Sequence, residues 1–78
     1  MMLCAEVAGY EMVLAITPNK HWSVSLRGSG HFLTPLGEVF GDLEDAKRHA
    51  CMWATQEAGL PFSLDLAQRT VWRECRGY

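Results

Sequence analysis

Residues 42–59 read DLEDAKRHACMWATQEAG, and their hydrophobic pattern predicts the longest helix of the chain. At about 100° per residue, the apolar residues fall on one side and the polar residues on the other. The predicted inner side holds Leu43, Ala46, Ala50, Trp53, Ala54 and Ala58, and the outer side holds Asp45, Arg48, Thr55 and Gln56. Asp42 is expected to cap the first turn, with Asp45 as a weak capping-box acid, and Gly59 before Pro61 is expected to end the helix. The inner side is suited to covering a small sheet.

Alternating apolar residues before this helix predict an antiparallel meander of three strands. Residues 7–17 place Tyr10, Met12, Leu14 and Ile16 on one face, and residues 21–27 do the same with Trp22, Val24 and Leu26. The third strand, residues 31–34 and 37–40, is expected to be broken or bulged around Pro35 and Gly37, and Pro35 favours an edge position. Residues 2–8 are either a fourth strand or a lead-in to the first, because Gly9 fits a bulge and a break equally well.

The C-terminal segment, residues 65–78, can be read as a strand or as a helix. As a strand it has no apolar face. As a helix it aligns Ala67, Val71 and Cys75, and Asp65 with Gln68 forms a plausible capping box. The helix is therefore favoured. The predicted fold is α+β: a meander, a main helix and a short C-terminal helix packed on one sheet face, in a single domain of 78 residues.

Composition and charge restrict the function and the compartment. Seven basic and nine acidic residues give a net charge of −2, which argues against binding nucleic acid or anionic membranes through bulk electrostatics. The three cysteines are widely spaced and odd in number, so they predict neither a disulfide framework nor a zinc motif, and we expect reduced thiols. Glu6 interrupts any apolar signal-peptide core, and no window reaches the roughly 18 apolar residues of a membrane helix. A cytoplasmic protein is expected.

No pattern in the sequence indicates catalysis. It contains no nucleophile elbow, phosphate-binding glycine loop or metalloprotease motif. Among the three histidines and three cysteines, His49 and Cys51 are the only close pair, and two residues apart on a helix they point in different directions. We therefore expect no catalytic residue, no metal site, no cofactor and no enzymatic activity.

One alternative is a small regulator that binds nucleic acid. Its candidate residues flank the two predicted hairpin turns, and they are Lys20, His21, Arg27 and His31. A basic and aromatic ribbon of this kind can enter a groove or stack on bases. The order of three strands and a helix, with Trp22 and Ala46, resembles the layout of plant AP2-type DNA-binding domains. The chain departs from that family at Ser23 and Ser25, where such a domain would need arginine.

The favoured hypothesis is a protein–protein interaction module with two candidate surfaces. Met52 lies at the centre of the main helix's polar face beside Arg48, and methionine is common at adaptable contact surfaces. The second surface is rich in residue types enriched at binding hot spots. It consists of Arg69, Trp72, Arg73, Arg76 and Tyr78.

The expected partner is a larger protein or ribonucleoprotein complex, and the chain itself is expected to be a monomer or small homo-oligomer. In size and lack of motifs it is similar to small proteins of phages and plasmids, including inhibitors of the anti-CRISPR type. That similarity implies inhibition by steric masking of a partner's surface, with charges setting the encounter rate.

Overall fold

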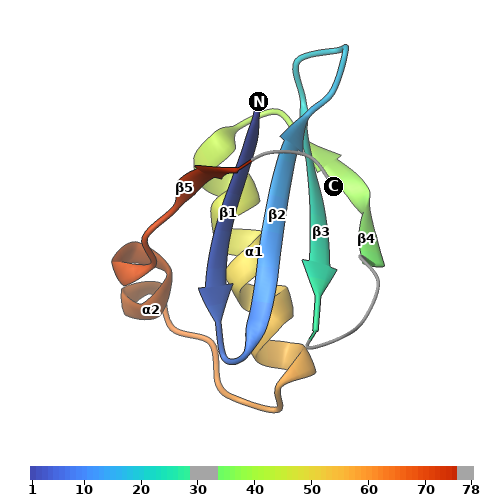
Figure 1. Ribbon diagram of the computed structural model, residues 1–78. Helices are drawn as coiled ribbons and strands as arrows, with labels where there is room; N and C mark the ends of the chain where they lie inside the picture. Colours follow the sequence, from blue (N-terminus) through green and yellow to red (C-terminus); the bar gives the residue numbers. More distant parts are fainter. Residues whose placement is uncertain (29–33, 76–78) are drawn as a thin grey trace.

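The structure is a computed structural model that describes residues 1–28 and 34–75 of the chain. The elements, in chain order, are β1 (Met2–Val7), β2 (Tyr10–Ile16), β3 (Trp22–Arg27), β4 (Thr34–Phe40), α1 (Leu43–Glu57), α2 (Leu64–Arg69) and β5 (Arg73–Cys75). They form one antiparallel sheet in the order β4-β3-β2-β1-β5, with α1 crossing one of its faces (Figure 1). The α+β prediction, with a meander, a main helix and a short second helix, is confirmed.

The first two strands form a tight hairpin, which resolves the question of residues 2–8. Val7 pairs with Tyr10, and the two residues between them both have positive φ, 55° at Ala8 and 85° at Gly9. Two central residues with positive φ are typical of the type I′ turn, whose twist matches that of the flanking strands. Residues 2–7 therefore form a separate fourth strand of the meander, and Ala8 and Gly9 form the turn.

The strand β4 contains Pro35 and lies at one edge of the sheet, which confirms the edge position predicted from this proline. The predicted bulge is present: between the pairs Ser23–Val39 and Ser25–Pro35, β3 has one residue and β4 has three, among them Gly37. Gly37 has a φ of +91°, which a residue with a side chain would rarely adopt. The part of the predicted strand at residues 31–33 lies outside the described residues.

The core lies between α1 and the sheet. Met12, Leu14, Val24 and Leu26 contribute the sheet side, and Ala46, Ala50, Cys51 and Ala54 contribute the helix side, all of them buried. The small alanine side chains let α1 approach the strands closely. Trp53 is half-buried and packs against this cluster, as predicted for the inner side of the helix.

Thr55 was predicted to lie on the outer side of α1, and this prediction is wrong, because the residue is 1% exposed. Its hydroxyl oxygen Oγ1 donates to backbone carbonyls of its own helix, at 3.0 Å from Cys51 O and 2.9 Å from Met52 O. This bonding satisfies the hydroxyl locally, so the residue can be buried without a further partner.

The helix α1 begins and ends where the sequence predicts, but the predicted capping hydrogen bond at its start is not formed. Asp42 is the N-cap residue, yet its side chain makes no capping hydrogen bond. At the other end, Gly59 has a φ of +72° and donates its N–H to Gln56 O, while Leu60 N–H donates to Thr55 O. Such a left-handed glycine satisfies the last carbonyls of a helix.

The C-terminal segment is helix in its first part only. α2 ends at Arg69, and residues 73–75 form β5 along Met2–Cys4 of β1. Ser63, not Asp65, caps α2, because its Oγ accepts from Leu66 N–H at 3.1 Å. The prediction of a helix across residues 65–78 is therefore wrong for β5. Residues 76–78 lie outside the described residues.

The prediction of three reduced cysteines is also wrong. Cys4 and Cys75 form a disulfide, and Cys51 remains a free, buried thiol. The sheet register explains the bond, because β5 places Cys75 beside β1 although 71 residues separate it from Cys4 in sequence.

Candidate protein-binding groove

A groove of about 300 Å³ lies between α1 and α2. It is lined by Glu44, Lys47 and Arg48 from α1, Leu64, Ala67 and Gln68 from α2, and Thr70 and Trp72 from the segment that follows. Both helices use the same spacing, i, i+3 and i+4, which places the side chains on one helix face. The groove is thus made by two facing helix surfaces and closed by the segment that leads into β5.

The charged wall of the groove belongs to α1. Lys47 Nζ lies 3.4 Å from Glu44 Oε2, and Arg48 pairs with Asp45. Both pairs join residues three positions apart on a solvent-facing helix surface. Because exposed pairs of this kind contribute at most about 1 kcal/mol, a partner can exchange them for its own charges at low cost.

The apolar wall belongs to α2 and to the segment after it. Leu64 is 59% exposed, and Trp72 is half-buried with its ring packed against the core. The indole Nε1 of Trp72 is closed to solvent and has no hydrogen-bond acceptor among the described residues. That atom is therefore closed to any ligand, whereas the Leu64 side chain is accessible.

A free thiol lies beneath the groove. Cys51 Sγ is 3.7 Å from Oγ1 of Thr70, and that hydroxyl also donates to Leu66 O at 2.8 Å. Burial raises the pKa of the Cys51 thiol, and the Thr70 hydrogen bond lowers it by less. Because the thiolate is the reactive form, a buried thiol with a raised pKa is poorly suited to act as a nucleophile.

Of the predicted partner-binding residues, the structure brings Arg48 and Trp72 together in the groove. Met52 is 40% exposed and lies one helical turn beyond Arg48, on the same side of α1. The sequence assigned Arg48 and Met52 to one surface and Trp72 to another. The packing of α2 beside α1 joins the two surfaces.

The other C-terminal candidates lie elsewhere. Arg69 pairs with Asp65 at 3.0 Å and lines a second groove of about 640 Å³, between α2 and the end of β1. Arg73 lies on the sheet, where its guanidinium contacts Glu11 Oε2 at 3.5 Å and donates to Cys4 O at 3.3 Å. Arg76 and Tyr78 lie outside the described residues.

The three alternative nucleic-acid residues that lie in the described part of the chain do not form one patch. Lys20 and His21 lie in the exposed turn before β3, whereas Arg27 is the last residue of that strand. Six residues at about 3.3 Å per residue separate His21 from Arg27 by roughly 20 Å. Arg27 also pairs with Glu11, and His31 lies outside the described residues.

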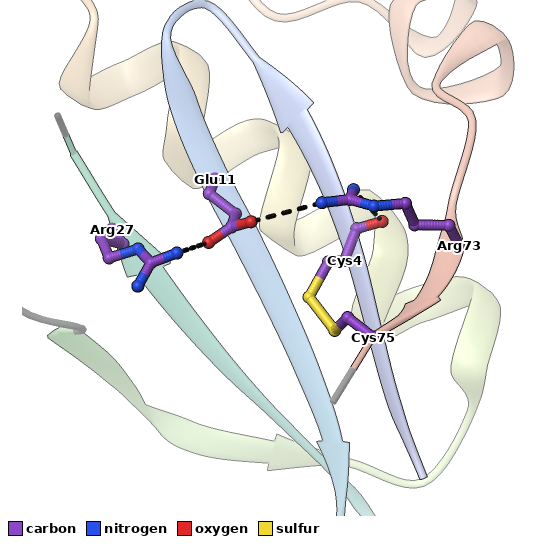
Figure 2. Close-up of a disulfide and its surroundings, with 5 residues drawn as sticks. All are labelled: Cys4, Glu11, Arg27, Arg73 and Cys75. Carbon is purple, nitrogen blue, oxygen red and sulfur yellow. Dashed lines mark hydrogen bonds and ion pairs between the residues drawn. A yellow bond between two sulfur atoms is a disulfide. The ribbon is translucent and has the colours of Figure 1, made fainter. Parts of the chain in front are cut away.

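Figure 2 shows a cluster that the sequence did not reveal. Glu11 reaches between Arg27 of β3 and Arg73 of β5, and the Cys4–Cys75 disulfide lies beside them. The contact between Glu11 and Arg27 follows from the hairpin register, in which these two residues are direct cross-strand partners. The Arg73 contact depends on β5, and a helix across residues 65–78 would not place Arg73 beside the sheet.

Within residues 1–28 and 34–75, no three side chains of the types His, Cys, Asp and Glu gather where they could hold a metal ion. No helix in the same residues is long and apolar enough to cross a membrane.

Comparison with protein-family models, with curated proteins and with solved structures found no match.

Proposed function

We propose that this protein is a non-enzymatic interaction module that binds a larger protein or ribonucleoprotein complex through the α1–α2 groove. The observation that carries the proposal is the composition of the groove, which sets Lys47 and Arg48 opposite the exposed Leu64. An apolar centre flanked by exchangeable charges is typical of protein contact sites.

Residue types support a protein partner over a small ligand. Arg48 is an arginine on a rigid helix, and arginine is enriched at interface hot spots. Met52 extends the same surface by one turn and adds a flexible apolar contact. In its narrower form, the proposal makes the chain an inhibitor of the anti-CRISPR kind, from a phage or plasmid, that acts by steric masking.

A differential capture experiment tests this proposal. The tagged chain and the double variant Arg48→Glu/Leu64→Asp are used to capture proteins from the same host lysate, with quantification by mass spectrometry. Both side chains are exposed, so the variant should fold normally. We expect a stoichiometric partner that the variant loses at least tenfold.

The matched control is Arg69→Glu/Val71→Asp, which makes the same changes of charge and polarity outside the groove. Val71 is 83% exposed, and both residues line the second groove. Equal capture by the groove variant and the control, or the lack of any stoichiometric partner, would contradict the proposal.

A further inference from the structure

The strand β5 has few attachments to the rest of the protein. It consists of three residues, it pairs only with Met2–Cys4, and among the described helices and strands β1 is its only packed neighbour. Arg73 and Glu74 are exposed, and Cys75 is half-buried. A three-residue ladder at a sheet edge has little stability of its own. Besides this ladder, β5 is held by the Arg73 contacts to Glu11 and to Cys4 O and by the Cys4–Cys75 bond, which is its only covalent attachment outside the backbone (Figure 2).

The position of β5 also determines one wall of the groove. Trp72 directly precedes β5, lines the groove and packs against the core. Thr70, two residues earlier, is held by its hydrogen bonds to α2 and to Cys51. The Trp72 indole therefore lies between two fixed points, the Thr70 hydrogen bonds before it and the Arg73 contacts with the covalent bond at Cys75 after it.

We propose that the Cys4–Cys75 disulfide is a reversible clasp that controls the α1–α2 groove. With the bond intact, β5 lies on β1 and Trp72 forms one wall of the groove. With the bond reduced, β5 leaves β1, Trp72 moves away, and the partner is bound more weakly. This inference rests on the proposed function, because it assigns redox control to the same binding site.

The reductant is a dithiol of the thioredoxin class, and the order of attack follows from burial. Cys4 is fully buried, whereas Cys75 is half-buried, so the incoming thiolate attacks the Cys75 sulfur. The S–S bond breaks, and Cys4 leaves with the electron pair as a thiolate that then takes a proton. The second thiol of the reductant attacks the mixed disulfide and frees Cys75. Two electrons and two protons pass to the protein, and the reductant becomes a disulfide.

Alternation along β1 provides a local reporter of the clasp. Met1 O accepts from Ile16 N–H of β2, and Cys4 O accepts from Arg73 on the β5 side. Because backbone groups of successive residues point to opposite sides of a strand, the Cys4 amide faces β5 and the Ala5 amide faces β2. Release of β5 should therefore expose the Cys4 amide and leave the Ala5 amide protected.

The test is amide exchange by NMR on the ¹⁵N-labelled full chain, oxidised and after reduction with a phosphine. We expect exchange of the Cys4 amide to accelerate at least tenfold, with Ala5 and Ala50 changing less than twofold. The indole N–H of Trp72 should shift, because its surroundings change when β5 leaves. The double variant Cys4→Ser/Cys75→Ser should give the reduced pattern under oxidising conditions.

Two outcomes would overturn the clasp. An unchanged Cys4 amide and Trp72 indole after reduction would show that β5 stays on β1 without the bond. Fast exchange at Ala5 and Ala50 as well would show that the disulfide stabilises the whole fold and does not act on β5 alone. Neither readout uses a partner, so failure of the clasp is distinct from failure of the groove, which the capture experiment measures.

Discussion

At the scale of single residues, Ser63 starts α2 through its side chain. Its Oγ satisfies the Leu66 N–H, which no carbonyl within the helix can do. We expect Ser63→Ala to destabilise α2 by about 1 kcal/mol. Amide exchange at Leu66 and Ala67 measures the effect.

The control for this cap is Asp65, which the sequence pattern favoured as the capping residue. Its carboxylate pairs with Arg69 on the exposed surface, a contact worth at most about 1 kcal/mol. Asp65→Asn should therefore change exchange in α2 less than Ser63→Ala does. The reverse ranking would show that Asp65 carries the cap.

Cys51 should make stability depend on alkaline pH. Burial raises its pKa above the ordinary value of 9.0, so the folded state holds the thiol proton at pH values where the unfolded chain has lost it. The resulting stability is fully present below about pH 9 and is lost as the pH rises further. Chemical denaturation at pH 8 and pH 10 measures this loss.

The variant Cys51→Ala separates this effect from other groups that titrate in the same range. It is expected to be less stable than the original chain at pH 8, because it leaves a small cavity in the core. The difference in unfolding free energy between the two proteins should shrink at pH 10. A constant difference would show that the thiol does not titrate differently in the folded state.

Thr55 shows why a helical pattern assigns some residues to the wrong side. A pattern counts threonine as polar and places it towards water, but its hydroxyl can bond to the preceding turn of its own helix. The apolar residues of the inner side, by contrast, have no such option, and Ala46, Ala50 and Ala54 are buried as predicted.

At the scale of elements, Glu11 of β2 joins two strands that are not neighbours. It is a mostly buried carboxylate between Arg27 of β3 and Arg73 of β5. Glu11→Gln leaves both guanidinium groups without their charged partner, and we expect a loss of about 1–3 kcal/mol. Urea denaturation at low and moderate salt gives the value.

Glu6 is the matched control for Glu11, because the two carboxylates are direct cross-strand partners in the β1–β2 register. Like charges in this position repel, and Glu6 is exposed. Glu6→Gln should therefore be neutral or stabilising, within about 0.5 kcal/mol. An equal loss in both variants would mean that the ion pairs of Glu11 contribute nothing.

The elements also show which part of the fold a sequence pattern can predict. The helix α1 and the strands β2 and β3 each carry a clear local period, and most of their core-facing residues were predictable from it. The exceptions are Thr55, which is buried, and Ile16 at the end of β2, which is 44% exposed although it was predicted to face the core. The segment after Leu60 contains a six-residue helix and a three-residue strand, both too short to show a period. Its structure depends on a ladder and a disulfide with the start of the chain, which local reasoning does not include.

The same limit applied to the candidate groove. Arg48 and Trp72 were both singled out by residue type, which local reasoning can judge. That they belong to one surface depends on how α2 packs beside α1, and only the three-dimensional structure gives that relation.

At the scale of the whole molecule, the charge distribution opposes binding to nucleic acid. The net charge is −2, and two of the four candidate residues lie at one end of β3 while Arg27 at the other end is paired with Glu11. We expect no saturable binding to duplex or single-stranded DNA or RNA up to about 100 µM at 50 mM salt. Fluorescence anisotropy with labelled oligonucleotides checks this expectation.

A positive result would have a definite form. Affinity would fall steeply with salt, and Lys20→Gln/His21→Gln would flatten that dependence, whereas Lys47→Gln on α1 would not. That outcome would favour the regulator hypothesis over the interaction module.

The pairing of β5 with β1 sets an order for biosynthesis. Strands β1 to β4 and α1 contact one another and precede β5 in the sequence, so they can assemble before β5 is present. The strand β5 has to return to β1, so the sheet reaches its full width only after residues 73–75 have been synthesised. Until then the outer edge of β1 is open, and a nascent chain can pair there with another copy of itself.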